Sequence, residues 1–165
     1  MTIPHADVRF DQLLADLSAR FVNLPPSEVD REIEQSLREI VEALGTDRST
    51  LMEFSDDGTQ LITTHSWARD GIPRDIGRLV AEETPWFTGT LLRGETIAYS
   101  RLPEDLPAEA AGEREYCAVT GLRSTLTIPV RVSGRPLAAL ATGCFRRERV
   151  WPAELVPRLR LLGEV

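Results

Sequence analysis

The segment between residues 124 and 145 limits the possible folds most, because its pattern predicts a β-hairpin. Apolar side chains alternate with Thr, Pro and Arg from Thr125 to Val132. This period of two is that of a strand whose two faces differ in polarity. Ser133-Gly134 then turns the chain, and Leu137–Phe145 returns as a largely apolar strand. The sequence therefore predicts a sheet with antiparallel strands.

Two amphipathic helices precede any strand. Apolar residues recur at helical spacing from Phe10 to Phe21 and again from Val29 to Leu44. The proline-containing run Asn23–Ser27 separates the two helices, with Ser27 as the expected N-cap of the second. Gly45 is expected to end the second helix, because glycine accepts the left-handed conformation found just after a helix.

The remaining elements are shorter and mostly linked by tight turns. The expected order is α-α-β-β-α-β-α-β-β-α, which indicates an α+β fold instead of a doubly wound parallel sheet. Apart from Gly163, the final helix has no stop signal before Val165, so we expect it to continue in the native protein. The elements expected in the middle and at the end are strands at Arg48–Phe54, Gln60–Trp67 and Thr96–Ser100, and helices at 84–94, at Pro107–Thr120 and from about Pro152.

Composition narrows the possible functions. The 165 residues fit one domain, and the net charge of -7 argues against nucleic-acid binding, which needs a basic face. All basic side chains are arginines, since the chain has no lysine. The sequence contains neither an apolar stretch of membrane-spanning length nor a signal peptide. Two cysteines are too few for a disulfide framework, so we expect a cytoplasmic location without membrane insertion.

Three segments together resemble the GAF domain family. Ala43–Arg48 (ALGTDR) is similar to the family's hydrophobic-Gly-x-Asp-Arg approach to its first strand. Gly121–Val130 (GLRSTLTIPV) resembles its G-hydrophobic-R-S-x-L-x-x-P-hydrophobic strand, and Gly134–Leu140 (GRPLAAL) its hairpin return G-x-x-x-G-x-L. Ala138 or Ala139 stands where the second glycine of that return is usual. The resemblance extends from Phe10 to the final helix.

The resemblance implies a fold and an arrangement of layers. The fold would be α+β and GAF-like, that is profilin-like and related to PAS, with a central antiparallel sheet. The first, second and last helices would cover one face, and shorter helices and loops between about Ile76 and Gly121 would roof a cavity on the other. Residues 1–165 would form a single GAF domain, with 1–9 as an N-terminal tail. The PAS fold itself is ranked below GAF, because it usually lacks the leading helix pair.

The resemblance also implies a function. The segments at His65–Ala68 and Arg146–Pro152 look like those of GAF domains attached to bacterial sensor histidine kinases and related regulators. A non-catalytic sensory and dimerisation domain is therefore expected, forming a homodimer through its N- and C-terminal helices. Its partners would be an adjacent output domain of the same chain and a small-molecule ligand. The alternative within this class is a ligand-free scaffold in a transcriptional regulator.

Candidate cavity residues come from the second strand and the expected roof. Leu61, Thr63, His65 and Trp67 would share one strand face by the period of two. His65 is not expected to bind a metal, because no second ligand lies at suitable spacing. Trp86, Phe87 and Leu91 would either roof the cavity or fill the core, and core filling is favoured. The full candidate set is His65, Trp67, Trp86, Phe87, Leu91, Tyr116, Cys117, Thr125 and Thr127.

One GAF-fold family, the free methionine sulfoxide reductases, is enzymatic and supplies the competing hypothesis. Such catalysis needs an exposed thiolate of low pKa with a resolving partner. Cys144 lies in an apolar strand, whereas Cys117 lies on a helix beside charged residues. The reductases' loop-borne cysteines and S-E-I-V-P strand are missing, and Ser124–Pro129 stands in place of that strand.

Other GAF subclasses are disfavoured, and no cofactor is predicted. Bilin-binding domains commonly carry Cys-His ahead of the R-x-x-L strand, but Cys117 precedes Ala118 and lies too close to Arg123. The cyclic-nucleotide signature contains a lysine, which this chain lacks. No Walker loop, HExxH helix, CxxC pair or EF-hand is found either.

Overall fold

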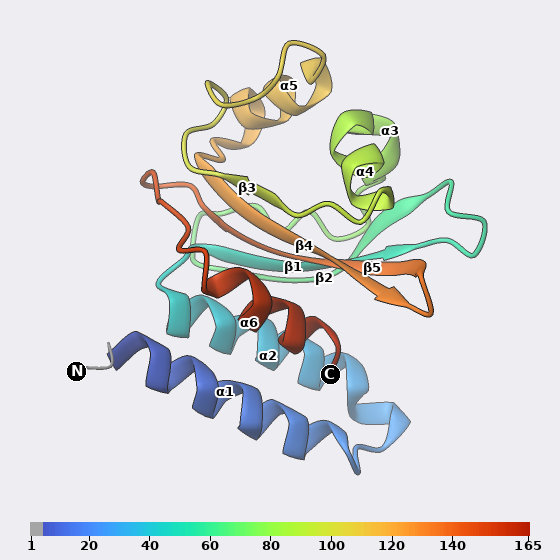
Figure 1. Ribbon diagram of the computed structural model, residues 1–165, viewed down its shortest axis with the longest axis vertical. Coiled ribbons are helices and arrows are strands. Elements are labelled where there is room, and N and C mark those ends of the chain that lie inside the picture. Colours follow the sequence, from blue (N-terminus) through green and yellow to red (C-terminus); the bar gives the residue numbers. More distant parts are fainter. Residues whose placement is uncertain (1–4) are drawn as a thin grey trace.

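A five-stranded antiparallel sheet lies between two sets of helices (Figure 1). The computed structural model describes residues 5–165, with side chains from Arg9 onward. The strand order across the sheet is β2-β1-β5-β4-β3, so strands distant in sequence pair at its centre. The strands are β1 (Arg48–Phe54), β2 (Leu61–Ala68), β3 (Ile97–Tyr99), β4 (Ser124–Val132) and β5 (Arg135–Cys144). The α+β fold and the β4–β5 hairpin are confirmed.

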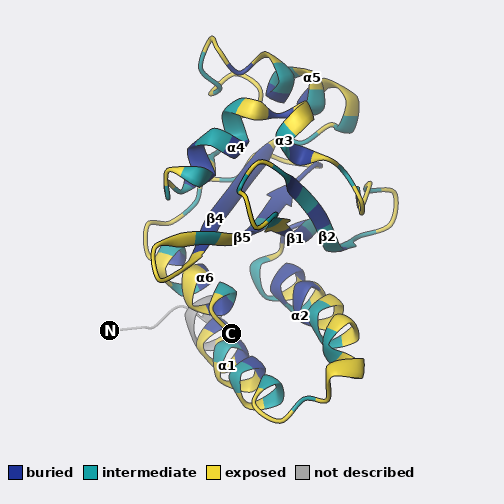
Figure 2. Cartoon of the chain, turned by 90° about the vertical axis from the view of Figure 1, so that its right-hand side faces the viewer, coloured by how far each residue is buried: buried dark blue, intermediate teal, exposed yellow. Residues whose placement is uncertain are grey.

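One face of the sheet is covered by the long helices α1 (His5–Phe21) and α2 (Val29–Leu44), together with the shorter last helix α6 (Leu155–Gly163). A short 3-10 turn, η1 (Pro26–Glu28), connects the first two. In Figure 2 the buried residues of α1 and α2 lie on their inner sides and the exposed residues on their outer sides. Their apolar stripes form one core with the sheet, which includes Phe10, Leu17, Leu37, Ile40, Leu126, Ile128, Leu140 and Leu159.

The opposite face is covered by three shorter helices, α3 (Val80–Glu83), α4 (Pro85–Leu92) and α5 (Ala111–Thr120). A smaller apolar cluster forms under α3 and α4, around Met52, Leu61, Val80, Leu91 and Ile97. The predicted arrangement, with the first, second and last helices on one face and the intermediate helices on the other, is therefore observed (Figure 1).

Several predicted boundaries were wrong. The tail expected at residues 1–9 is already helical from His5, and residues 1–4 lie outside the described part of the chain. The fifth helix begins at Ala111 instead of Pro107, because 107–110 form a turn in which the Ala110 N–H donates to Pro107. The last helix begins at Leu155, after a turn at Pro152. Helix α3 was not predicted, since a single turn is too short for a periodic pattern.

A β-bulge in β2 changes which of its side chains share a face. Leu51 of β1 pairs with His65 and Met52 pairs with Thr63, so Thr64 is the extra residue of β2. An extra residue reverses the alternation of side chains beyond it. Leu61 and Thr63 consequently face α3 and α4, whereas Trp67 packs in the core under the long helices. The prediction that residues 61, 63, 65 and 67 share one face was therefore wrong.

A buried carboxylate links the beginning of β1 to the end of β5. Gly45 takes the left-handed conformation with φ of 68°, as predicted, and ends α2. Asp47 follows two residues later and is only 8% exposed. Its Oδ2 atom accepts hydrogen bonds from the backbone N–H groups of Phe145 at 2.7 Å and Arg146 at 3.1 Å. Two N–H groups that the β5 strand end would leave unpaired are thereby satisfied.

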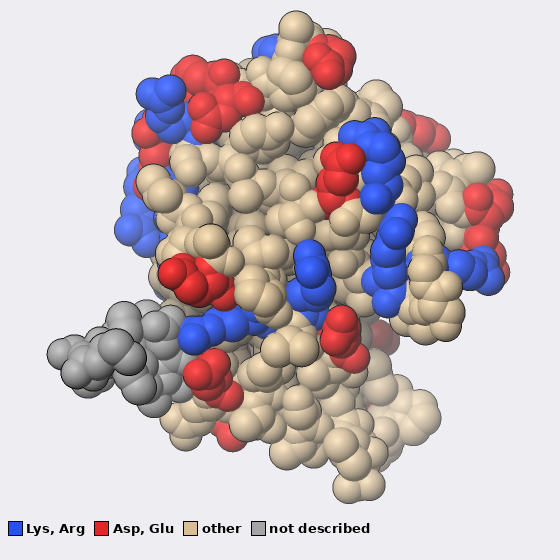
Figure 3. All heavy atoms as spheres, in the orientation of Figure 1, with Lys and Arg blue, Asp and Glu red and all other residues tan. Residues whose placement is uncertain are grey.

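None of the helices within residues 5–165 is long and apolar enough to cross a membrane. On the face shown in Figure 3, acidic side chains lie beside arginines. Ion pairs of this kind include Arg20–Glu39 at 2.7 Å and Arg93–Glu95 at 3.1 Å. Because these pairs are partly or largely exposed to solvent, each contributes little to stability.

We expect Asp47→Ala to lower the free energy of unfolding by about 2–4 kcal/mol, because the buried N–H of Phe145 and the partly buried N–H of Arg146 lose a charged acceptor. Asp47→Asn keeps an acceptor oxygen and should lose less. Asp56→Ala, at an exposed turn position, is the matched control and should stay within about 0.5 kcal/mol of the parent. Urea unfolding followed by circular dichroism measures all three. Equal stability of Asp47→Ala and Asp56→Ala would contradict the linking role of Asp47.

Candidate functional site

A cavity lies between the sheet and the short helices. Its empty space is about 740 Å³ when the part open to solvent is counted, and the centres of water molecules can occupy about 80 Å³ of it. Strands β1 to β5, helices α4 and α5, and the segment between β2 and α3 all contribute to its wall. Aromatic and apolar lining residues are Met52, Trp86, Phe87, Ile97, Tyr99, Leu102, Leu106, Cys117, Leu122, Ala141 and Gly143. Polar lining residues are Arg48, Thr50, Thr63, Asp75, Arg78, Thr84, Glu113, Tyr116, Thr125, Thr127 and Thr142.

The cavity exists because the central strands carry small side chains on this face and large ones on the other. On β5, Ala141 and Gly143 line the cavity, whereas Leu140, next to Ala141, packs under the long helices. On β4, Thr125 and Thr127 line the cavity, whereas Leu126 belongs to the opposite core. Interior space between packed elements is normally filled by side chains. The Ala, Gly and Thr residues beneath α4 and α5 are too small to fill this space, so a cavity remains.

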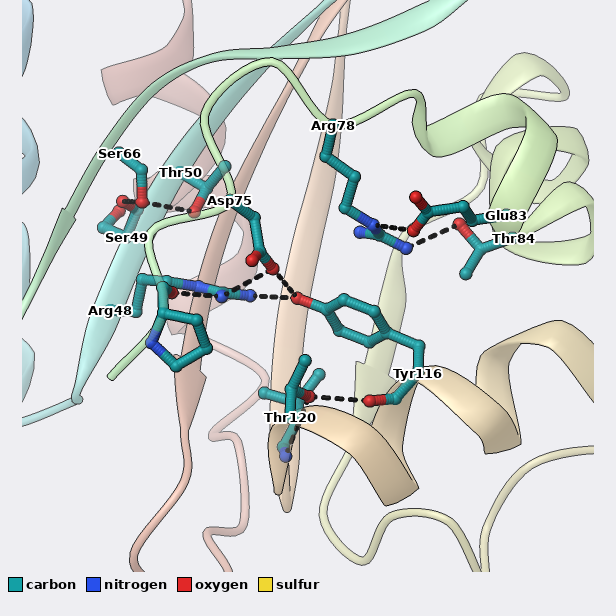
Figure 4. A network of polar contacts seen from close by, with 12 residues as sticks. Arg48, Ser49, Thr50, Ser66, Asp75, Arg78, Glu83, Thr84, Tyr116 and Thr120 are labelled. Carbon is teal, nitrogen blue, oxygen red and sulfur yellow. Dashed lines mark hydrogen bonds and ion pairs between the residues drawn. The ribbon is translucent and has the colours of Figure 1, made fainter. Parts of the chain in front are cut away.

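A polar network closes one side of the cavity (Figure 4). Arg48 of β1 donates from Nη2 to the Tyr116 hydroxyl at 2.7 Å and from Nη1 to Asp75 at 3.2 Å. The Tyr116 hydroxyl donates to the same Asp75 carboxylate at 2.6 Å. Burial raises the pKa of Tyr116, so the phenol remains a proton donor to Asp75 at neutral pH. This network joins β1, the loop before α3 and helix α5.

Arg78 extends this side of the cavity toward α3. Its guanidinium lies over the Tyr116 ring, 3.8 Å from the ring centroid. Its Nε atom donates to Glu83 at 2.6 Å. The arrangement combines a cation–π contact with a charge-assisted hydrogen bond. The charges of Arg48 and Arg78 are thus each matched by a carboxylate of the protein, Asp75 and Glu83 respectively.

Glu113 of α5 is a buried carboxylate at the opposite wall, only 6% exposed. Its Oε2 atom accepts the backbone N–H of Phe87 at 3.0 Å, at the first turn of α4. Thr84 stands at the N-cap position of α4, but its hydroxyl donates to the Val80 carbonyl and makes no cap. Glu113, which belongs to helix α5, caps this end of α4 instead. Its second oxygen, Oε1, has no hydrogen-bond partner among the described residues.

The structure brings six of the nine candidate residues together at the cavity: Trp86, Phe87, Tyr116, Cys117, Thr125 and Thr127. The rings of Trp86 and Tyr99 lie 6.0 Å apart with a tilt of 44°. Leu91 is fully buried in the apolar cluster beneath α4 and does not line the cavity, which agrees with the favoured core-filling interpretation. Whether any of these residues binds a ligand stays a prediction.

His65 and Trp67 lie on the other face of the sheet, so their expected position at the cavity was wrong. The bulge at Thr64 turns both toward α2. His65 contacts Asp30 of α2 through Nε2 at 3.0 Å and Thr64 through Nδ1 at 2.9 Å. Trp67 packs against the large core, and the Arg38 guanidinium lies 5.7 Å from its ring centroid.

Four charged cavity residues were missed: Arg48, Asp75, Arg78 and Glu113. Arg48 could have been found, because it alternates with Thr50 and Met52 along β1 and all three line the cavity. Asp75 and Arg78 follow the loss of periodicity after β2, where the sequence offers no spacing to interpret. Glu113 belongs to a charged helical segment in which several positions read as solvent-exposed. Its burial depends on how α5 packs against α4.

Both cysteines are buried and free. Burial raises the pKa of the Cys117 thiol to about 11, and the nearby Glu113 and Glu104 carboxylates act in the same direction. Burial also raises the pKa of Cys144. A thiol of this kind is protonated at neutral pH and a poor nucleophile. Residues 5–165 contain no group of three or more His, Cys, Asp or Glu side chains placed to hold a metal ion.

Comparison with known sequences gives one family and one regulatory relative. Residues 28–164 match the GAF domain family. The chain is also 28% identical over 148 residues to the methanogenesis regulatory histidine kinase FilI of Methanothrix harundinacea. That match covers 86% of this chain but 16% of the kinase, so the chain spans about a sixth of its relative.

Solved structures share the fold at low identity. The phycoerythrobilin-bound GAF domain of a cyanobacterial phytochrome superposes with a TM-score of 0.76 at 15% identity, covering 96% of this chain and 92% of the other. The GAF domain of a phosphoenolpyruvate-protein phosphotransferase from Coxiella burnetii gives a TM-score of 0.73 at 18% identity, covering 96% and 89%. At such identities the likeness concerns the fold, and it confirms the predicted family architecture.

We expect both thiols to react slowly with 5,5′-dithiobis(2-nitrobenzoate) in the folded protein. At pH 8 a thiol with a pKa of about 11 contains about a hundredfold less thiolate than an unperturbed cysteine. The rate should rise at least that much after unfolding in guanidinium chloride. The variant Cys144→Ala isolates the signal of Cys117. Rapid reaction of either thiol in the folded state would contradict this result and revive the reductase hypothesis.

Proposed function

Because this chain belongs to the GAF domain family, we propose that it is a sensory domain whose small-molecule ligand binds between the sheet and helices α4 and α5. The single observation that carries the proposal is the cavity itself. Most of the surface that its wall exposes is apolar or aromatic, and a few polar groups such as Arg48, Tyr116 and Glu113 converge on it. This composition is typical of small-ligand sites.

The polar network supports a binding role, because it holds the cavity wall in a defined geometry. Tyr116 bridges Arg48 and Asp75, which come from different parts of the chain. A ligand that meets pre-arranged side chains loses less free energy to ordering them. The same network connects the roof of the cavity to β1, at the centre of the sheet.

Signal transmission would pass through the sheet. Strands β1 and β5 present one set of side chains to the cavity and the alternate set to the long helices. Thr50 and Ala141 line the cavity, while the neighbouring Leu51 and Leu140 pack under those helices. A ligand that favours one position of these strands would bias the packing of α1, α2 and α6. The similarity to a regulatory histidine kinase supports a place for the domain in a two-component signalling protein, next to an output domain of the same chain.

Pairing of two copies through the long helices would provide the output surface. The helical layer leaves Val22, after α1, and Leu161 of α6 largely or half exposed, at 75% and 48%. Burial of such apolar area between copies is the usual driving force for association. We therefore propose a homodimer formed through α1, α2 and α6.

Catalysis is not part of this proposal, and the protonated, buried thiols of Cys117 and Cys144 support that view. A second candidate function is a scaffold that transmits between neighbouring domains without a ligand. The cavity has space for only about 80 Å³ of water centres. The scaffold becomes the preferred function if no small compound enters that space.

A metabolite screen by thermal unfolding tests ligand binding. A compound present at about 100 times its Kd should add about 2.7 kcal/mol and raise the Tm by several degrees. Ala141→Leu should abolish the shift, because three extra carbons enter the cavity. Ala118→Leu adds the same volume at an exposed position of α5 and should preserve it. If no compound stabilises the parent protein, the ligand-binding proposal fails and the scaffold remains.

Light scattering after gel filtration tests the dimer. The parent chain should have twice the mass of one copy at micromolar concentration. Leu161→Glu should weaken association by about tenfold or more, because it places charge at the centre of an apolar contact. Val119→Glu is the matched control, since Val119 is 80% exposed on α5 across the sheet. A monomeric parent chain at high concentration would overturn the proposal.

A further inference from the structure

We propose that the cavity selects a small organic cation, a protonated amine on a short apolar body, and that Glu113 is the residue that receives its N–H. This inference rests on the proposed function and names the chemical class of the ligand. It starts from the one buried carboxylate oxygen at the cavity wall that lacks a partner among the described residues, Oε1 of Glu113.

Glu113 is fixed in place from one side only. Its Oε2 atom accepts the Phe87 N–H at 3.0 Å, at the amino end of α4. A helix N-terminus favours a negative charge close to its first N–H groups, so this contact supports the ionised carboxylate. A carboxylate can accept at both oxygens. Because Glu113 is 6% exposed, bulk solvent contributes little to the second oxygen.

The cations of the protein do not supply the missing partner. Arg48 is engaged by Asp75 and Tyr116. Arg78 is engaged by Glu83 and by the face of Tyr116. Each guanidinium at the cavity therefore already has a carboxylate partner, Asp75 or Glu83, and neither pairs with Glu113. A buried charge is stable when it is paired and hydrogen-bonded. A ligand cation would complete the balance.

The walls beside Glu113 suit the rest of such a ligand. Its anchoring contact is with Phe87, and Trp86 precedes that residue on the same helical turn. The Trp86 and Tyr99 rings, 6.0 Å apart, both line the cavity. Aromatic faces attract cations and also accept apolar carbon. The space for about 80 Å³ of water centres restricts the ligand to about one ring or a short chain.

An anionic ligand fits this wall poorly. Its charge would meet the unpaired Glu113 oxygen, and it would have to displace Asp75 or Glu83 to reach a free guanidinium. A neutral alcohol can donate to Oε1, but it brings no charge to balance the carboxylate. Hydrogen bonds between charged partners are about twice as strong as neutral ones. The expected order of affinity is therefore ammonium, then alcohol, then carboxylate.

Isothermal titration calorimetry at pH 7 with three probes of nearly equal shape tests this order on the unmodified chain. The probes are benzylammonium chloride, benzyl alcohol and sodium benzoate. We expect benzylammonium to bind at least about tenfold more tightly than benzyl alcohol, and benzoate not to bind measurably. Equal or tighter binding of the alcohol or the benzoate would overturn the inference while leaving a ligand-binding cavity intact.

Two charge-matched variants locate the contact. Glu113→Gln keeps an acceptor for the Phe87 N–H but loses the charge, and it should weaken benzylammonium binding by about tenfold or more. Glu115→Gln removes the same charge from an exposed position of α5 and should change binding less than twofold. Equal affinities of Glu113→Gln and the parent protein would overturn the inference. Failure of all three probes to bind the parent would overturn it too, and the wider metabolite screen then decides the proposed function separately.

Discussion

Asp47 accepts hydrogen bonds from two consecutive backbone N–H groups, those of Phe145 and Arg146, and thereby joins the first residue before β1 to the end of β5. The Asp47 N–H and C=O bond in turn to Gly143 and Arg69. Buried backbone groups need such partners. β1 and β5 are neighbours in the middle of the sheet. The position of β1 relative to β5 therefore sets the register of the strands that pair outside them. Arg48, next along β1, reaches the cavity only from this register.

The central strands also separate two kinds of interior. Leu126 and Leu140 fill the space under the long helices, while Thr127 and Ala141 leave space under the short ones. The two faces cannot move independently, because alternate residues of one strand belong to each. A displacement of the cavity-facing residues would consequently also displace the backbone on which α2 and α6 pack. In the proposed sensory role, ligand binding would thus be coupled to the helical layer through β1 and β5 without a separate pathway.

The sequence predicted the parts whose signal is local and periodic. The β4–β5 hairpin and the left-handed Gly45 follow from alternation and from the conformational freedom of glycine, and both are found. The face of His65 and Trp67 could not be predicted, since a bulge at Thr64 has no periodic signature and reverses every later position. Trp86 and Phe87 were candidates for the roof although core filling was favoured for them, and both line the cavity.

The charged part of the cavity depends on contacts that no local pattern encodes. Glu113 is buried because α5 packs against the first turn of α4, and that contact provides an N–H group in place of solvent. The N-cap position of α4, Thr84, uses its hydroxyl elsewhere, so the helix end relies on a carboxylate from another segment. A carboxylate that caps a helix with one oxygen and faces a cavity with the other connects ligand charge to helix position. Any cation bound at Oε1 would draw on the same charge that holds α4 and α5 together.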